Sequence, residues 1–236
     1  MTKFPVFSVA QDQGSRSYQC DHWATYRDDT TGAHAFVVLD GIGDRAAVRD
    51  FVHYYAPRLA EATARQPNPA DALAEIRAEC LGELHDAVAV AAVYRPDDSK
   101  LRFAWSGDSR AYWLSRIWGI ECATRDHNAA QELRDQGRKP GPYDHNIVTS
   151  TLGEGEIGTA EVDRDRVLRA LLCTDGAYHP LETYRTPLLE NILALSDDAQ
   201  EAATDLVREG VTKSRTADRS YADNATALAI DFAPLS

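Results

Sequence analysis

Short apolar runs that meet an aspartate at a glycine or a tight polar turn constrain most strongly how this chain of 236 residues can fold. Such a run is typical of a buried strand that places a carboxylate at the rim of a sheet. Four of these segments occur, at residues 37–41, 105–110, 171–176 and 223–226. The chain is therefore expected to present several carboxylates at strand ends.

The aspartates of these segments are Asp40, Asp108, Asp175 and Asp223. If the strand ends meet, the carboxylates repel one another, and the pKa of at least one of them rises. Hard divalent cations such as Mg²⁺ or Mn²⁺ relieve that repulsion and prefer carboxylate, carbonyl and water ligands. The pattern therefore predicts a metal-dependent hydrolase.

The motifs also stand in the order of a known family. An arginine segment at residues 14–21 precedes Asp-Gly-Ile-Gly (40–43), Gly-Asp-Ser-Arg (107–110), Asp-His (126–127), Thr-Asp-Gly (174–176) and Asp-Asn (223–224). One Asp-Gly alone is a weak signal, because it mostly marks a turn. Together, and across nearly the whole chain, the segments resemble the metal-dependent protein phosphatase 2C (PPM) family.

The resemblance implies two Mn²⁺ or Mg²⁺ ions in the site. Asp40 would bridge the ions, the carbonyl oxygen of Gly41 would be a further ligand, and Asp175 and Asp223 would hold the second ion. A hydroxide shared by the two ions would hydrolyse phosphomonoesters. The chain would then be a serine/threonine protein phosphatase that acts on phosphorylated proteins and opposes a protein kinase.

Three further residues carry expectations of their own. Arg16 is the candidate phosphate clamp, because its planar fork can bind two phosphate oxygens, although a surface arginine paired with a nearby acid is the competing interpretation. Asp21 would orient metal-bound water. Asp108 could order its tight turn with Arg110 as ion-pair partner, or contribute to a third, weaker metal site, and the two interpretations are compatible.

Two departures from the family pattern stand out. Cys20 occupies the position of a Glu or Gln that holds metal-bound water, and a neutral thiol is a poor partner for Mg²⁺ or Mn²⁺. Losses of this kind weaken metal affinity by roughly 10–100-fold. Ile42 stands where many eukaryotic members have a general-acid histidine. Cys20 motivates the alternative function, a catalytically weak pseudophosphatase that binds phosphoproteins or partners, although such a module would not need Asp40, Asp175 and Asp223.

Composition and the absence of other motifs narrow the possible partners, the cellular location and the alternative classes of enzyme. The chain has 25 Lys+Arg against 37 Asp+Glu, a formal charge of -12, which disfavours nucleic acid and anionic membranes as partners. No signal-peptide core or membrane-spanning run is present, so a cytoplasmic location is expected. The four cysteines form no zinc or disulfide pattern and lack the cysteine-phosphatase spacing, and there is no P-loop. A single domain over residues 1–236 is the simplest organisation.

The apolar periodicity predicts an α+β fold. Helical spacing recurs over residues 48–59 and 73–84, and again over 187–195 and 199–211, while 87–94, 101–105 and 225–232 favour strands. The resemblance implies two packed antiparallel β-sheets flanked by antiparallel helix pairs, an α-β-β-α sandwich.

Residues 126–145 carry two local predictions. Asp126 or Asn128 is expected to cap a helix, which explains His127 without catalysis. Residues 135–145 are expected to form a mobile flap beside the site.

Overall fold

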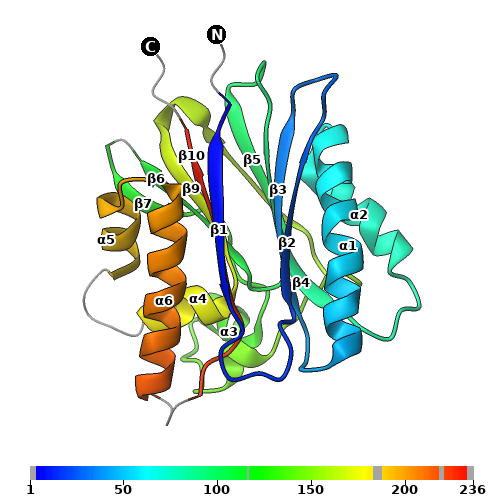
Figure 1. The fold of residues 1–236 in the computed structure, drawn as a ribbon. Coiled ribbons are helices and arrows are strands. Elements are labelled where there is room, and N and C mark those ends of the chain that lie inside the picture. The colour runs from blue at the N-terminus through cyan, green and yellow to red at the C-terminus, as the bar shows by residue number, and fades with distance from the viewer. Residues whose placement is uncertain (1–3, 116, 183–187, 218–220, 233–236) are drawn as a thin grey trace.

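The computed structural model describes residues 4–115, 117–182, 188–217 and 221–232, and in it two five-stranded antiparallel sheets pack face to face (Figure 1). The first sheet has the order β1 (Val6–Asp12), β10 (Ala225–Asp231), β9 (Val167–Cys173), β6 (Arg110–Ser115) and β7 (Gly119–Cys122). The second has the order β2 (Asp21–Arg27), β3 (His34–Gly41), β4 (Ala87–Tyr94), β5 (Lys100–Ser106) and β8 (Gly158–Asp163).

Helices cover the outer face of each sheet, which confirms the predicted α-β-β-α sandwich (Figure 1). The second sheet is covered by the pair α1 (Ala46–Arg65) and α2 (Pro69–Glu79). The first is covered by α4 (Asp175–Glu182), α5 (Leu188–Leu195) and α6 (Ala199–Ala217). Short helical segments complete the described elements: α3 (Ala129–Asp135), η1 (Asp144–Asn146) and η2 (Arg164–Arg166). None of the helices in the described ranges is both long and apolar enough to cross a membrane.

The apolar run of β3 is explained by burial on both faces. Phe36 and Val38 pack in the core between the sheets, whereas Val37 and Leu39 pack in the core beneath α1 and α2. Because successive strand residues point to opposite faces, a strand between two cores needs apolar side chains at every position. This burial on both faces fixes the position of β3. It thereby fixes the position of Asp40, which lies near the C-terminal end of the strand.

The sequence predictions fail mainly at element ends. The second helix was expected to reach Leu84, but α2 ends at Glu79 and Leu84 is 93% exposed. Gly82 follows with a φ of 90°, in the left-handed region that terminates helices. The last described helix continues beyond the expected residue 211 to Ala217. Asn128 caps α3 by accepting a hydrogen bond from the amide of Gln131, which confirms that prediction.

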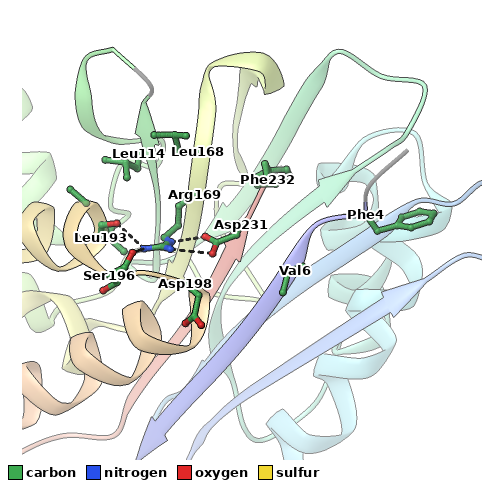
Figure 2. Close-up of a pocket in the computed structure, with 11 residues that line it drawn as sticks. Phe4, Val6, Leu114, Leu168, Arg169, Leu193, Ser196, Asp198, Asp231 and Phe232 are labelled. Atoms are coloured by element: carbon green, nitrogen blue, oxygen red, sulfur yellow. Dashed lines mark hydrogen bonds and ion pairs between the residues drawn. The ribbon is translucent and has the colours of Figure 1, made fainter. Parts of the chain in front are cut away.

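A buried arginine, Arg169, joins the first sheet to the end of α5, near where β1 begins and β10 ends (Figure 2). Arg169 donates to both carboxylate oxygens of its cross-strand neighbour Asp231, at 2.6 and 3.1 Å, and to the carbonyl oxygens of Leu193 and Ser196. It lines a cavity of about 670 Å³ whose other walls are largely apolar. Since Arg169 is bound to the sheet and to the end of α5, its role here is structural.

We expect Arg169→Ala to lower the free energy of unfolding by about 2 kcal/mol, because it leaves Asp231 and two backbone acceptors without their donor. Urea unfolding followed by circular dichroism would measure the loss. Arg208→Ala is the control, because Arg208 pairs only with acids at the exposed surface of α6, and should cost under about 0.5 kcal/mol. Equal losses in the two variants would contradict a structural role for Arg169.

Candidate active site

The four aspartates singled out in the sequence line a single cavity of about 360 Å³. Asp40 lies near the end of β3, Asp108 follows β5, Asp175 opens α4 directly after β9, and Asp223 precedes β10. Both sheets therefore contribute carboxylates to the same rim. The other lining residues are Arg16, Gly41, Ile42, Gly43, Val88, Asn146, Val148, Tyr221 and Asn224.

Close backbone packing sets the position of Asp40. The following residue, Gly41, donates its amide to the carbonyl of Cys20 at 3.0 Å. A Cβ at this glycine would lie 2.5 Å from Val48 and 2.8 Å from the Cys20 carbonyl oxygen, so no larger residue fits. The glycine of the Asp40-Gly41 motif is thus required by the packing of β3 against α1.

The cavity is short of positive charge. Burial, followed by repulsion from the neighbouring aspartates, raises the pKa of Asp40 well above its ordinary value. The same causes raise the pKa of Asp108 to about 8, and burial with repulsion from Asp223 raises the pKa of Asp175 to about 6. These side chains are surrounded by protein although the cavity reaches them. Such a group of oxygens would gain stability from a bound cation.

Arg16 is held by one of the four aspartates. Its Nε and one terminal nitrogen donate to the two oxygens of Asp223, each at 2.6 Å. Hydrogen bonding to Asp223 raises the pKa of Arg16, and the ring of Tyr221 lies 5.9 Å from its guanidinium carbon. The structure shows the pairing with an acid and places Arg16 at the cavity, and its role as a phosphate clamp stays a prediction.

Asp21 lies beneath the cavity wall and is only 1% exposed. It faces Asp40 across the β2–β3 register, and its Oδ2 accepts hydrogen bonds from the hydroxyls of Thr174 and Thr226, both at 2.8 Å. Burial raises the pKa of Asp21 to about 7, against the lowering effect of the two hydroxyls. Its other oxygen is buried without a hydrogen-bond partner among the described residues. Asp21 can therefore act on the cavity only through Asp40 and its surroundings.

The expected ion pair between Asp108 and Arg110 is wrong. Arg110 instead forms a two-pronged pair with Asp126, at 2.6 and 2.7 Å, and also contacts Glu182. Tyr178 donates to the backbone carbonyl of Asp108, so this turn is held through its main chain and the carboxylate is left at the cavity.

His127 supports the turn before Asp108. Its amide donates to the carbonyl of Gly107 at 3.0 Å, and its ring accepts from the Gly107 amide at 3.3 Å. This pairing confirms the structural interpretation of His127. It also positions the main chain that carries the Asp108 carboxylate.

Cys20 is buried and lies outside the set of residues that line the cavity. Its sulfur is 3.7 Å from the carbonyl oxygen of Arg45, and burial raises the pKa of the thiol. A neutral, enclosed thiol is a poor nucleophile and reacts slowly with oxidants. The residue contributes to the site through its main chain, which contacts Gly41 and Asn224.

Asn224 has a positioning role that the sequence did not reveal. Its side-chain oxygen accepts from the amide of Cys20 at 2.7 Å, and its nitrogen donates to the carbonyls of Gln13 and Tyr18 at 2.8 and 3.0 Å. One amide side chain thereby ties the loop of Arg16 to the strand that follows Asp223. Only the Asp-Asn dipeptide signalled its importance.

The segment expected to be a flap leads directly into the cavity wall. Asn146 and Val148, which follow residues 135–145, line the cavity. His145 stacks on His179 of α4, with ring centroids 4.5 Å apart, and so joins this segment to the helix that begins at Asp175. Its mobility stays a prediction.

The donor set fits a hard divalent cation, because carboxylate oxygens predominate and their raised pKa values reflect uncompensated negative charge. In the described part of the chain, however, no three His, Cys, Asp or Glu side chains are grouped closely enough to hold one ion. Asp223, which accepts both hydrogen bonds from Arg16, is turned toward that guanidinium. The ligand candidates share a cavity without closing around one point.

Comparison with solved structures finds proteins that share this fold over nearly the whole chain. Similar structures include the serine/threonine phosphatase Stp1 from Staphylococcus aureus, with 16% identity, 99% of this chain and 97% of that chain covered, and a TM-score of 0.78. The catalytic domain of the phosphatase PstP, in complex with two manganese ions, is 21% identical over 96% of this chain and 97% of that one, with a TM-score of 0.72. No family model and no curated protein sequence matches the chain.

A third similar structure is the PPM phosphatase MsPP from Mycobacterium smegmatis in complex with cacodylate, 25% identical over 97% of this chain and 98% of that one, with a TM-score of 0.69. The chain therefore has the fold of the bacterial PPM serine/threonine phosphatases. The resemblance predicted from its motifs is confirmed.

We expect Asn224→Asp to lower the free energy of unfolding by about 2 kcal/mol at pH 7. The substitution removes both donated hydrogen bonds and places a buried charge beside Asp223. Chemical denaturation would measure the change. Asn68→Asp is the matched control, because Asn68 caps α2 by accepting from Ala70, and aspartate caps equally well. The role assigned to Asn224 would be wrong if both variants kept wild-type stability.

Proposed function

We propose that this chain is a Mn²⁺- or Mg²⁺-dependent serine/threonine protein phosphatase. The observation that carries the proposal is the meeting of Asp40, Asp108, Asp175 and Asp223 with Arg16 in one cavity. These residues come from segments that span the chain, and they occupy motif positions of a phosphatase family whose fold this chain has.

Each group has a place in a metal site. Asp40, Asp175 and Asp223 would hold the two ions, with the carbonyl oxygen of Gly41 as a further ligand. Asp108 would serve a third, weaker site. When bound, such ions supply the Lewis acidity that activates water and neutralises phosphate oxygens.

The protein's own residues then bind and orient the substrate. Arg16 would bind two oxygens of the phosphoryl group through its planar fork. Asp21 is buried beside Asp40 and accepts hydrogen bonds from two threonine hydroxyls. It would help to orient metal-bound water through Asp40. Ile42 and Tyr221 supply apolar surface at the cavity, with exposed fractions of 49% and 43%.

The substrate would be a protein phosphorylated on serine or threonine, and the enzyme would oppose a protein kinase in signalling. No histidine lines the cavity among the described residues, so the departing alkoxide would take its proton from solvent in the site. An aryl phosphate needs that help less, because its leaving group is more acidic. A cytoplasmic location stays a prediction and is part of this proposal.

A pseudophosphatase remains the second candidate, and the Arg16–Asp223 pair is the observation that favours it. A permanent ion pair there would block a metal ligand and the phosphate clamp at once. The chain would then bind phosphoproteins or partners without turnover. Hydrolysis of p-nitrophenyl phosphate by the native chain separates the two candidates.

We expect the native chain to hydrolyse p-nitrophenyl phosphate with Mn²⁺, to lose activity with EDTA, and to regain it with excess Mn²⁺. Asp175→Asn should lower the Mn²⁺-dependent rate by about 100-fold or more, since even groups that merely support metal ligands change affinity or activity by about 10–100-fold.

Asp197→Asn provides the charge-matched control for this experiment. Asp197 is exposed between α5 and α6 and does not line the cavity, so the variant should keep the native rate. Absence of turnover in the native chain at every Mn²⁺ and Mg²⁺ concentration would favour the pseudophosphatase.

A further inference from the structure

The contact between Arg16 and Asp223 uses the whole carboxylate. Each oxygen accepts one guanidinium hydrogen bond at 2.6 Å, and Oδ1 also accepts the amide of Asn224 at 2.8 Å. Two-pronged, charge-assisted bonds of this kind are among the stronger polar contacts in proteins. Of the four aspartates in the cavity, Asp223 is the one that this arginine neutralises.

A divalent cation needs the same oxygens. Mg²⁺ binds carboxylate oxygens at about 2.0–2.1 Å. An ion on the same edge of the Asp223 carboxylate as Arg16 would take up the lone-pair directions that the guanidinium fork now uses, because Oδ1 already accepts two hydrogen bonds and Oδ2 accepts one. The two positive groups would also repel each other at such close range. On that edge, Asp223 cannot hold Arg16 in its present geometry and a metal ion together.

We propose that Arg16 and the divalent cation compete for Asp223, so that metal binding releases the Arg16 fork to bind the substrate phosphate. The inference rests on the proposed phosphatase function and adds a coupling between its two ligands. Arg16 acts as a positioning residue for Asp223 before the metal binds and contacts the phosphate afterwards.

The surroundings permit this exchange with little movement of the main chain. The loop of Arg16 is anchored, because the side chain of Gln13 donates to the Arg16 carbonyl at 2.8 Å and Ser15 donates its amide to Ala222 at 2.7 Å. The Arg16 side chain is 29% exposed, and that of Asp223 is 35% exposed. A rotamer change of one side chain is therefore enough to open the pair.

The competition predicts effects of opposite sign from one substitution. Loss of the Arg16 fork should strengthen metal binding, because Asp223 becomes free, and should weaken phosphate binding, because the clamp is lost. A general disturbance of the fold would weaken both. Since the pair is partly exposed, its opening should be worth a factor of about 3–10 in metal affinity.

The test is isothermal titration of the metal-stripped full chain with Mn²⁺, in native, Arg16→Gln and Arg16→Lys forms. Both variants should bind Mn²⁺ more tightly than the native chain, Arg16→Gln by about 3–10-fold. Arg16→Lys keeps the charge and loses the fork, so it distinguishes release of Asp223 from simple loss of repulsion. The Mn²⁺-loaded proteins are then titrated with inorganic phosphate, where Arg16→Gln should bind at least about tenfold more weakly.

Arg49→Gln is the control for removal of one positive charge. Arg49 stands on α1, pairs with the exposed Asp50 and lies over the ring of Tyr18, but contacts none of the cavity aspartates. Its Mn²⁺ affinity should stay within about twofold of the native value.

The outcomes separate this inference from the proposed function. Native Mn²⁺ affinity in both Arg16 variants would overturn the competition and leave the phosphatase proposal intact. Tighter binding in Arg16→Gln alone would also overturn it, in favour of simple charge repulsion. A native chain that binds no Mn²⁺ would overturn the proposed function and this inference together.

Discussion

Mutual repulsion among carboxylates is the constraint on which this structure depends. The two sheets bring Asp40, Asp108 and Asp175 into one partly enclosed cavity, where burial disfavours their charges. Only a rigid scaffold can hold such groups together, and strands buried on both faces, such as β3, supply it. Bringing these carboxylates together lowers the free energy of unfolding. A cation that binds only the folded state would raise it again, so a scaffold of this kind suits metal binding.

Sequence reasoning succeeded where one physical rule acts alone. A fully apolar run such as residues 87–94 is typical of a strand buried on both faces, and a carboxylate that ends such a run is expected at a sheet rim. The aspartates that line the cavity are therefore predictable from the sequence. The capping role of Asn128 followed in the same way, because it depends only on neighbouring residues.

The remaining features depend on contacts between distant segments, which no local pattern encodes. An ion pair of Arg110 with Asp108, two residues away, was one interpretation of the sequence, yet Arg110 pairs with Asp126 and Glu182. The Arg16–Asp223 pair joins residues 207 positions apart, and no local sequence pattern around either residue predicts the other as its partner. Helix α2 ended early because the residues after it adopt a turn, with Gly82 in a left-handed conformation that only glycine adopts easily.

The position of β10 has a consequence for how the protein is made. This strand is the last described element of the chain, yet it lies inside the first sheet, between β1 and β9, rather than at an edge. During translation, β1 can therefore pair with its only described sheet partner only after residues 225–231 have been synthesised. Asp223 and Asn224 arrive with that strand. The cavity lined by the four aspartates is therefore complete only when the first and last described strands have paired.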